Sequence, residues 1–579
     1  MCILEKSCVG FGGIVNTRFF GLLLFSATFA YTLLGCNQGI DVYDEGLTVY
    51  GATQVLDGAV IYKDIWSNYG PGQYYLQALA FMFFGKQLIV ERVLCSFVNA
   101  ALVFCVYCLA RKLVSRPLAL FSWFFSLALL SKYPLYGRTA PTALLFCLIS
   151  CLCLSQVFQK GGRRWLFLAG FFIGLSTVFR HDFGAYAFVS ESLVIILFAV
   201  TEHCDQNLGR FGRLKAVVQK LAFLVIGIAV VVLPVSGVLF AHVSLGLLFE
   251  DLIFFPAIVY PKIREIPWPP FPSLQIFFSG HVSRFFHKVL DVFPAYSPIT
   301  LILPAIYLCS SIRRRVVPGS THWLGLVLLV EGVFFYNYSA VLSVVDHMVP
   351  QIIFASILLP WALVDFEAGR ENKHYGFLRW LTIFAIVLAS ASFGRIFLQS
   401  TGDRMCLSKF GRKLTVLNLD RCKGFRLNRE QAESLEQAIF YVQKATAPTE
   451  RIFAGTSRHD RLWASDPMFY FLADRHNATR YSDMCPGLVT TEPVQKEIIK
   501  DLLSNRVRCI ILTSAFEDVE RTNISNESSG VVLLDNFIRE YYNEAASFGY
   551  YSIRLINLKG EEKQISEVGK QRTENKAKN

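Results

Sequence analysis

The chain has 579 residues, of which 53% are hydrophobic, 14% aromatic and only 17% charged. A soluble protein carries charge on about a quarter of its residues, so this composition excludes an ordinary soluble enzyme. The formal net charge is +12. No nucleic-acid-binding signature accompanies it. We attribute the charge mainly to residues that set membrane topology and to the polar end of the chain.

Uncharged apolar runs recur from Phe19 to Phe397 and are close to the length of about 20 residues that a helix needs to cross a bilayer. In lipid such runs must be helical, because a helix satisfies its own backbone polar groups. We therefore predict a polytopic α-helical membrane protein with about eleven transmembrane helices. They are Phe19–Cys36, Val93–Ala110, Pro117–Ser131, Pro141–Phe158, Trp165–Phe179, Phe183–Val200, Leu221–His242, Ser297–Ser311, Trp323–Ala340, Val349–Val364 and Leu381–Phe397.

The loops between these spans differ in their basic residues. Clusters of arginine and lysine in short loops mark the cytoplasmic side of a membrane protein. Five loops on one side carry such clusters: Arg111, Lys112 and Arg116; Lys160, Arg163 and Arg164; Arg210, Arg213 and Lys215; Arg313, Arg314 and Arg315; and Arg370 with Lys373. The N-terminus is then cytoplasmic, and the C-terminal part of the chain is outside.

The chain divides into three parts. Residues 1–400 form the transmembrane module, with long outer loops at 37–92 and 243–296. Residues 401–558 form a soluble, non-cytoplasmic α/β domain, because helical and strand patterns alternate there. We expect helices at 429–445, 467–473 and 492–503 and strands at 451–454, 509–512 and 550–556. Residues 559–579 are predicted to be a disordered polar tail. If the domain is outside, Cys406 and Cys422 are the nearest pair for a disulfide.

Three carboxylates follow the first span within five residues: Asp41, Asp44 and Glu45. Neighbouring like charges raise one another's pKa, and a carboxylate with a raised pKa can act as a general base. A solvated loop that is merely acidic explains the same residues equally well. In an extended segment Asp44 and Glu45 would point to opposite sides.

The following segment contains Gly70-Pro71-Gly72-Gln73-Tyr74-Tyr75, an apolar run from Leu76 to Gly85, and Glu91-Arg92 at the start of the second span. Together with Asp44-Glu45-Gly46, this order resembles the GT-C glycosyltransferases. It is most similar to the polyprenyl-phosphate-sugar enzymes related to protein O-mannosyltransferases and aminoarabinose transferases. The second outer loop and Asp346-His347 also look like members of that group.

The resemblance implies a base in the first outer loop that deprotonates the acceptor while a sugar leaves a lipid phosphate. The matching position is Asp44, with Asp41 and Glu45 as alternatives. A leaving phosphate requires positive charge or oriented donors. The outer-side candidates are Arg180, Lys132, Arg138, Arg264 and Arg92. For any one of them, snorkelling at the interface is the simpler explanation.

Three further residues are candidates for substrate binding: His181 beside Arg180, and Asp346 with His347 at the outer end of a span. An ionisable residue within a span is a functional hypothesis by default, although a structural hydrogen-bonded pair at 346–347 fits equally well. No metal-ligand spacing occurs in the sequence. Members of the resembling family differ in their use of a divalent metal, so the resemblance leaves that cofactor open.

The sequence thus predicts a membrane glycosyltransferase with a polyprenyl-phosphate-sugar donor, inversion at the sugar, and a lipid, glycan or protein acceptor. The membrane would be the plasma membrane of a bacterium or the endoplasmic reticulum of a eukaryote. A transporter or lipid flippase is the main alternative, although no internal repeat of the kind common in transporters is found. A non-catalytic scaffold with a docking domain is a third hypothesis.

Overall fold

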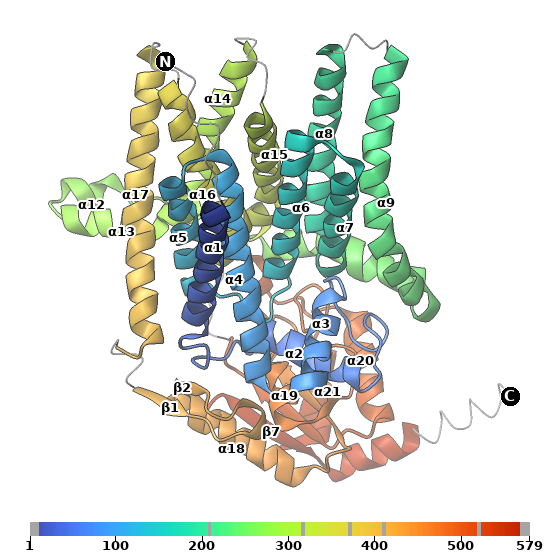
Figure 1. The fold of residues 1–579 in the computed structure, drawn as a ribbon. Helices are drawn as coiled ribbons and strands as arrows, with labels where there is room; N and C mark the ends of the chain where they lie inside the picture. Colours follow the sequence, from blue (N-terminus) through green and yellow to red (C-terminus); the bar gives the residue numbers. More distant parts are fainter. Residues whose placement is uncertain are drawn as a thin grey trace.

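A computed structural model describes residues 11–205, 210–313, 319–368, 373–407, 413–517 and 523–567. Most of them are helical. Helices run side by side in a bundle, and a smaller mixed domain covers one end of that bundle (Figure 1). The predicted fold class is confirmed.

All eleven predicted spans coincide with helices. These are α1 (Phe11–Leu33), α4 (Leu88–Leu113), α5 (Arg116–Lys132), α6 (Ala140–Lys160), α7 (Arg163–Phe179), α8 (His181–Asp205), α9 (Arg210–His242), α14 (Ile302–Arg313), α15 (Ser320–Val341), α16 (Val345–Ala368) and α17 (Lys373–Arg404). Within the described ranges, eight helical stretches are long and apolar enough to cross a membrane. The other three helices that match predicted spans are shorter. The apolar part of α1 is Phe19–Leu33, and α5 and α7 have 17 residues each.

The segment before the eighth predicted span is a separate helix. α13 (Val282–Tyr296) continues through the 3-10 turn η2 (Ser297–Leu301) into α14, and the apolar helical stretch Val282–Cys309 includes all three. Arg284, His287, Lys288 and Asp291 interrupt the hydrophobic run in α13. Figure 1 shows α13 lying across the bundle beside α17, whereas α14 runs with the other bundle helices. The predicted span Ser297–Ser311 thus corresponds to η2 and α14.

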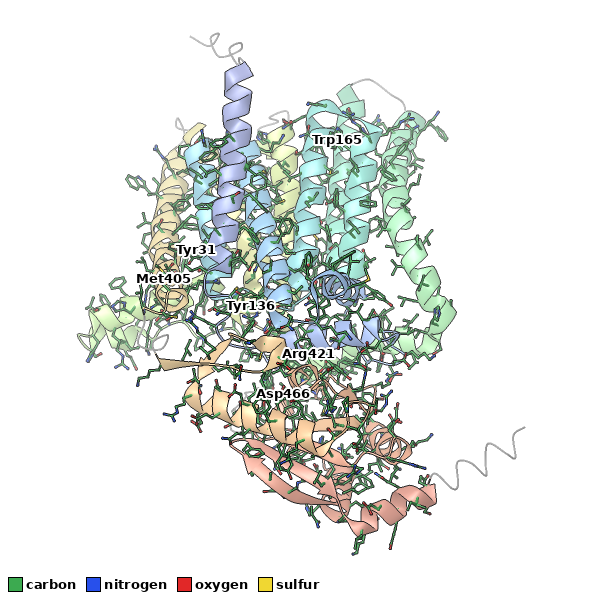
Figure 2. All side chains as sticks on the ribbon, turned by 60° about the horizontal axis from the view of Figure 1, so that its bottom comes forward. Tyr31, Tyr136, Trp165, Met405, Arg421 and Asp466 are labelled. Atoms are coloured by element: carbon green, nitrogen blue, oxygen red, sulfur yellow. The ribbon has the colours of Figure 1, made fainter. Side chains whose placement is uncertain are left out.

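In the described part of the chain, the helix ends that flank the five basic loops lie at one end of the bundle, and the C-terminal domain lies at the other (Figure 1). Figure 2 shows the same arrangement through two labelled residues: Trp165 lies at the far end, whereas Tyr136 lies where the bundle meets the domain. The structure therefore places these helix ends on the side opposite the domain, as the basic-residue rule requires.

The outer loops are largely helical. The first contains α2 (Asp44–Leu56) and α3 (Gly72–Phe84). The second contains α10 (Leu245–Phe249), the π-helix η1 (Glu250–Val259), α11 (Tyr260–Arg264) and α12 (Leu274–Phe278). Helix α3 exposes Leu79, Met82, Phe83 and Phe84, as expected for an amphipathic segment that lies along the membrane interface.

The C-terminal domain contains a five-stranded sheet in the order β4-β3-β5-β7-β6. Its strands are β3 (Arg451–Thr456), β4 (His476–Asn477), β5 (Cys509–Thr513), β6 (Tyr542–Phe548) and β7 (Tyr551–Ile556). Strands β4, β3 and β5 are parallel, whereas β7 and β6 are antiparallel to their neighbours. A separate two-stranded sheet pairs β1 (Leu414–Val416) with β2 (Arg426–Asn428). The helices are α18 (Arg429–Ala445), α19 (Met468–Ala473), α20 (Glu492–Ser504) and α21 (Leu533–Tyr541), with 3-10 turns η4 (Asp420–Cys422) and η5 (Ile524–Asn526).

Three expectations at the edges of this domain are corrected. Residues 401–404 belong to α17 and not to the soluble domain. Residues 559–567 of the predicted disordered tail are helical, and residues 568–579 lie outside the described part. Cys406 and Cys422 are both free thiols; Cys422 is buried in the domain core, whereas Cys406 accepts hydrogen bonds from Gln38 and Arg426.

The domain packs directly against α2. The backbone of Met468 in α19 lies so close to Gly46 that a side chain at Gly46 would collide with it. The Tyr43 hydroxyl donates to Asp483 Oδ1 (2.7 Å), and the Asn477 amide donates to the Tyr50 hydroxyl (2.7 Å). The domain therefore fixes the helix that begins with Asp44.

Candidate active site at the outer end of the bundle

Helix α2 begins at Asp44 because Asp41 satisfies its first backbone donors. Asp41 Oδ1 accepts from the amides of Tyr43 (3.1 Å) and Asp44 (3.0 Å). An acidic residue in the first turn also interacts favourably with the helix dipole. The side chain of Asp44 keeps 22% of its surface exposed, so this carboxylate remains accessible from the cavity described below.

Arg138 joins Asp44 to Asp346. Its Nη2 lies 2.8 Å from Asp44 Oδ2, and its Nη1 donates to Asp346 Oδ2 at 2.6 Å. The three residues come from the start of α2, the turn between α5 and α6, and the start of α16. Arg138 supplies the positive charge between the two carboxylates, which would otherwise repel each other.

Gly137 allows this turn to approach α2. Its φ is +70°, and a Cβ atom there would lie 2.5 Å from the Cα of Glu45 and 2.7 Å from Thr48 Oγ1. The Gly137 amide also donates to Glu91 Oε1 at 2.6 Å. Both the backbone conformation and the close approach therefore require glycine beside Arg138.

Glu45 and Arg92 form a buried ion pair. Both side chains are at most 2% exposed. Arg92 Nε and Nη2 bond to the Glu45 carboxylate, with 2.6 Å for the Nη2 contact. Arg92 also donates to the carbonyls of Cys36 and Gly39, each at 3.0 Å. The geometry therefore commits both side chains to each other, and neither residue lines the two cavities that meet at Arg180, described below.

Asp41 faces a different cavity from Asp44. Burial and the neighbouring Asp44 raise the pKa of Asp41 to about 7, while Arg138 opposes that rise. Asp41 lines an open cavity of about 340 Å³ together with Lys132, Arg138 and Asp346. Lys132 is exposed at the end of α5. The structure thus places these two predicted residues beside the Asp44 site without bringing them into its cavity.

Two cavities meet at Arg180. The smaller one, about 20 Å³, is lined by Asp44, Arg138 and Arg180, and the larger one, about 310 Å³, is lined by Arg180 and His181. Both are also lined by Tyr69, Tyr338 and His347. Of the predicted candidates, the structure therefore gathers Asp44, Arg138, Arg180, His181 and His347 around two cavities that share lining residues.

Arg180 is held in place by its neighbours. Its Nε and Nη2 donate to Asp182 at 3.0 and 2.7 Å, and its Nη1 lies 3.4 Å from the Tyr338 hydroxyl. The guanidinium also lies over the rings of Tyr69 and Tyr338, 5.2 and 4.6 Å from their centroids. These contacts fix the cation at the boundary between the two cavities.

Two histidines complete the lining, whereas Arg264 lies apart from it. His347 stacks on Tyr338, with ring centroids 5.1 Å apart, and the Nδ1 of His181 is buried without a hydrogen-bond partner among the described residues. Arg264 is 3% exposed and lies over Trp463 of the C-terminal domain, 4.0 Å from the ring centroid. Arg264 lines neither of the two cavities.

Sequence reasoning assigned no role to the aromatic and acidic partners of Arg180. Tyr69 directly precedes the Gly70-Pro71 motif, and Asp182 follows Arg180 by two residues, so both could have been found by proximity. Tyr338 and Tyr260 carry no such signal. Tyr338 lies near the end of α15, and Tyr260, which lines the larger cavity, begins α11.

Comparison with known proteins gives one family match and several structural matches. The family model described as dolichyl-phosphate-mannose-protein mannosyltransferase matches residues 68–236. ArnT from Cupriavidus metallidurans bound to undecaprenyl phosphate has a TM-score of 0.51 and 10% identity, covering 94% of this chain and 98% of ArnT. The apo form of the same ArnT has a TM-score of 0.51 and 11% identity, covering 93% of this chain and 98% of ArnT. The chain has the GT-C fold.

An apo oligosaccharyltransferase from Archaeoglobus fulgidus gives a TM-score of 0.49 and 11% identity, covering 86% of this chain and 70% of that protein. The comparison with curated proteins gives no significant sequence match. The matched proteins are glycosyltransferases. The family-model match includes Arg138, Arg180 and His181 but begins after Asp44.

Proposed function

We propose that this GT-C protein is a membrane glycosyltransferase that moves a sugar from a polyprenyl phosphate to an acceptor, with Asp44 as general base. The observation that carries the proposal is that Asp44 and Arg180 line one cavity at the outer end of the bundle. A carboxylate that accepts a proton and a cation that receives a leaving phosphate are the two groups that such a transfer requires.

In the proposed reaction, Asp44 takes the proton of the acceptor hydroxyl or amine. The acceptor atom attacks the anomeric carbon while the bond from that carbon to the phosphate oxygen breaks, which inverts the anomeric configuration. The bonding electrons leave with the phosphate. Arg138 orients Asp44 through its 2.8 Å contact and keeps the carboxylate directed toward the cavity.

Arg180 is proposed to bind the donor phosphate, and His181 can contribute its buried Nδ1. Much of the larger cavity beyond them is apolar, with walls formed by Leu252, Ile253, Pro256, Ala257, Val341 and Leu342. A phosphate at Arg180 would thus adjoin a surface suited to prenyl carbons. ArnT, which shares the fold, has been crystallised with undecaprenyl phosphate, which supports this class of donor.

The orientation proposed for the chain places this site on the non-cytoplasmic side of a plasma or endoplasmic reticulum membrane. A test is to introduce single cysteines at exposed positions on the two ends, Lys444→Cys in α18 and Lys160→Cys in α6. In intact cells, or in sealed vesicles whose outer face is the non-cytoplasmic one, a membrane-impermeant thiol reagent should label Lys444→Cys but not Lys160→Cys. Labelling of Lys160→Cys alone would reverse the proposed orientation.

The test of the reaction uses purified protein and a panel of polyprenyl-phosphate sugars with their lipid, glycan and peptide acceptors. Asp44→Asn keeps the size and the hydrogen-bonding capacity of the side chain but removes the base, so we expect transfer to fall at least about 100-fold. Asp57→Asn at the exposed end of α2 is the matched control. Undiminished turnover by Asp44→Asn would refute the assignment.

Arg180→Gln tests the phosphate contact separately. We expect the KM for the donor to rise about tenfold or more because a charge-assisted contact to phosphate is lost. Arg284→Gln, on the exposed face of α13, should leave KM unchanged. Movement of a labelled polyprenyl phosphate across vesicles without covalent change, equal in wild type and Asp44→Asn, would favour a flippase instead.

A further inference from the structure

A second polar cluster lies deep in the bundle, away from the proposed transfer site. It consists of Cys151 on α6, Glu191 on α8 and Glu331 on α15. Each is fully buried, and the ligand atoms of the three lie within 4.8 Å of one another. The sequence assigns no role to Glu191 and Glu331, because their spacing along the chain has no metal-ligand pattern.

The three helices place this cluster at one depth. Glu191 follows the outer start of α8 by about ten residues, Glu331 precedes the outer end of α15 by about ten, and Cys151 follows the outer start of α6 by about eleven. At 1.5 Å per residue, each lies about 15 Å below the outer end of its helix. The cluster is therefore near the middle of the apolar bundle.

Two carboxylate oxygens in the cluster have no partner within the described ranges. Glu191 Oε1 and Glu331 Oε1 are buried without a hydrogen bond. The other oxygens are satisfied: Ser150 Oγ donates to Glu191 Oε2 (2.8 Å), and Cys151 Sγ donates to Glu331 Oε2 (3.1 Å). Among the described residues, no ion pair of Glu191 or Glu331 with a lysine, arginine or histidine is found.

Unpaired carboxyl groups in an apolar interior are costly, and a cation bound between them would remove that cost. The donor set is one sulfur and two carboxylate oxygens. Zinc binds this set of donors, whereas calcium and magnesium prefer oxygen alone. Bond lengths of about 2.0–2.3 Å place the ligand atoms of a tetrahedral zinc ion about 3.3–3.8 Å apart, so small side-chain rotations would close the cluster around an ion.

We propose that Cys151, Glu191 and Glu331 form an intramembrane zinc site that links α6, α8 and α15. The ion enters as the thiol proton and any carboxyl protons leave to water, so that the Cys151 thiolate and one oxygen of each glutamate bind it. Ser150 orients Glu191 from outside the coordination sphere. Two of the three helices adjoin residues of the proposed transfer site: Arg180 directly precedes α8, and Tyr338 lies in α15.

The test uses the full chain in detergent, stripped with a chelator and reloaded with Zn²⁺ or with Co²⁺ as a spectroscopic substitute. We expect stoichiometric zinc, and with Co²⁺ a thiolate-to-cobalt charge-transfer band in the near ultraviolet. Cys151→Ser should abolish that band, and Glu331→Gln should weaken binding by at least about tenfold. Cys153→Ser, a buried thiol on the same helix but outside the cluster, should keep both signals.

A metal-dependent rise in the melting temperature of wild type, but not of Cys151→Ser, would provide a second readout that does not depend on transfer activity. Absence of the band in wild type, or its persistence in Cys151→Ser, would overturn the proposal in favour of a neutral carboxyl cluster. Loss of the metal from Asp44→Asn with retention in Glu331→Gln would also overturn it, because the ion would then belong to the transfer site.

Discussion

The guanidinium of Arg138 lies 2.8 Å from the carboxylate of Asp44, although the two residues come from different outer segments of the bundle. The same guanidinium contacts Asp346 at 2.6 Å. One planar cation thus sets the position of a carboxylate that the proposed reaction requires. A planar guanidinium can hold two acceptors at fixed angles, which an ammonium group cannot do.

The first prediction follows from this bridge. Arg138→Lys should lower the transfer rate about tenfold and Arg138→Gln about 100-fold, because a small displacement of the base is costly. The measurement is the initial rate at saturating donor. Arg284→Lys, an exposed arginine on α13, is the control. Wild-type rates in Arg138→Gln would show that Asp44 needs no positioning by Arg138.

The second prediction concerns the buried pair of Glu45 and Arg92. Breaking a buried pair leaves an uncompensated charge, so Glu45→Gln or Arg92→Met should each lower the free energy of unfolding by about 3–5 kcal/mol. The exposed pair of Lys86 and Asp57 is the comparison, and Lys86→Ala should cost less than about 1 kcal/mol. Thermal unfolding in detergent measures both. If Glu45→Gln and Arg92→Met melted at the same temperature as Lys86→Ala, the Glu45–Arg92 pair would not stabilise the fold as predicted.

The third prediction separates packing from backbone strain. Gly137→Ala adds a methyl group 2.5 Å from the Cα of Glu45 at a φ of +70°. Gly424 has a φ of +84°, but in the described part of the chain no atom lies within 4 Å of where its Cβ would be, so Gly424→Ala tests the strain alone. We expect about 1 kcal/mol of destabilisation for Gly424→Ala and at least about 2 kcal/mol for Gly137→Ala, with loss of transfer only in the latter. Melting temperatures and transfer rates of the two variants check both expectations.

The fourth prediction concerns pH. The pKa of Asp41 is raised to about 7 by burial and by Asp44, so the folded chain binds more protons than the unfolded chain between about pH 4 and pH 7. The stability contributed by the protonated Asp41 is fully present below about pH 4 and is lost as the pH rises through about 7. In Asp41→Asn the fall in stability with rising pH should be shallower by up to about 1.4 kcal/mol per pH unit in that window.

Melting temperatures measured from pH 4 to pH 8 in one detergent would check the effect of Asp41. Parallel curves for wild type and Asp41→Asn would show that the carboxyl titrates normally. Asparagine keeps the side-chain oxygen that accepts from the amides of Tyr43 and Asp44, so the start of α2 should be preserved.

The spans could be predicted because apolarity over about 20 residues has one solution in lipid. The site could be predicted only in part. The resemblance to GT-C enzymes pointed to Asp44, and predicted topology placed Arg138 and Arg180 on the outer side. The spacing of the carboxylates alone could not separate Asp44 from Glu45. The segment is a helix instead of an extended loop, and a helix turns about 100° per residue. Asp44 therefore faces the cavity and Glu45 faces Arg92.

The remaining features depend on contacts between distant parts of the chain. Arg138 reaches Asp346 across a separation of 208 residues, and no local pattern records such a pairing. The same applies to the cluster of Cys151, Glu191 and Glu331, whose members are isolated polar residues in three apolar runs. In α13 the charged residues Arg284, Lys288 and Asp291 correctly separated this helix from the span that begins at Ser297.

The close packing of Gly46 against Met468 has a consequence for biogenesis. The spans are synthesised before residues 468–483, and chains fold in the order in which they emerge. Until residues 468–483 have emerged, Tyr43 and Tyr50 lack Asp483 and Asn477 as hydrogen-bond partners. A nascent chain that is already inserted in the membrane would therefore hold a loosely seated Asp44, and catalytic competence would be acquired only when translation of the final domain is complete.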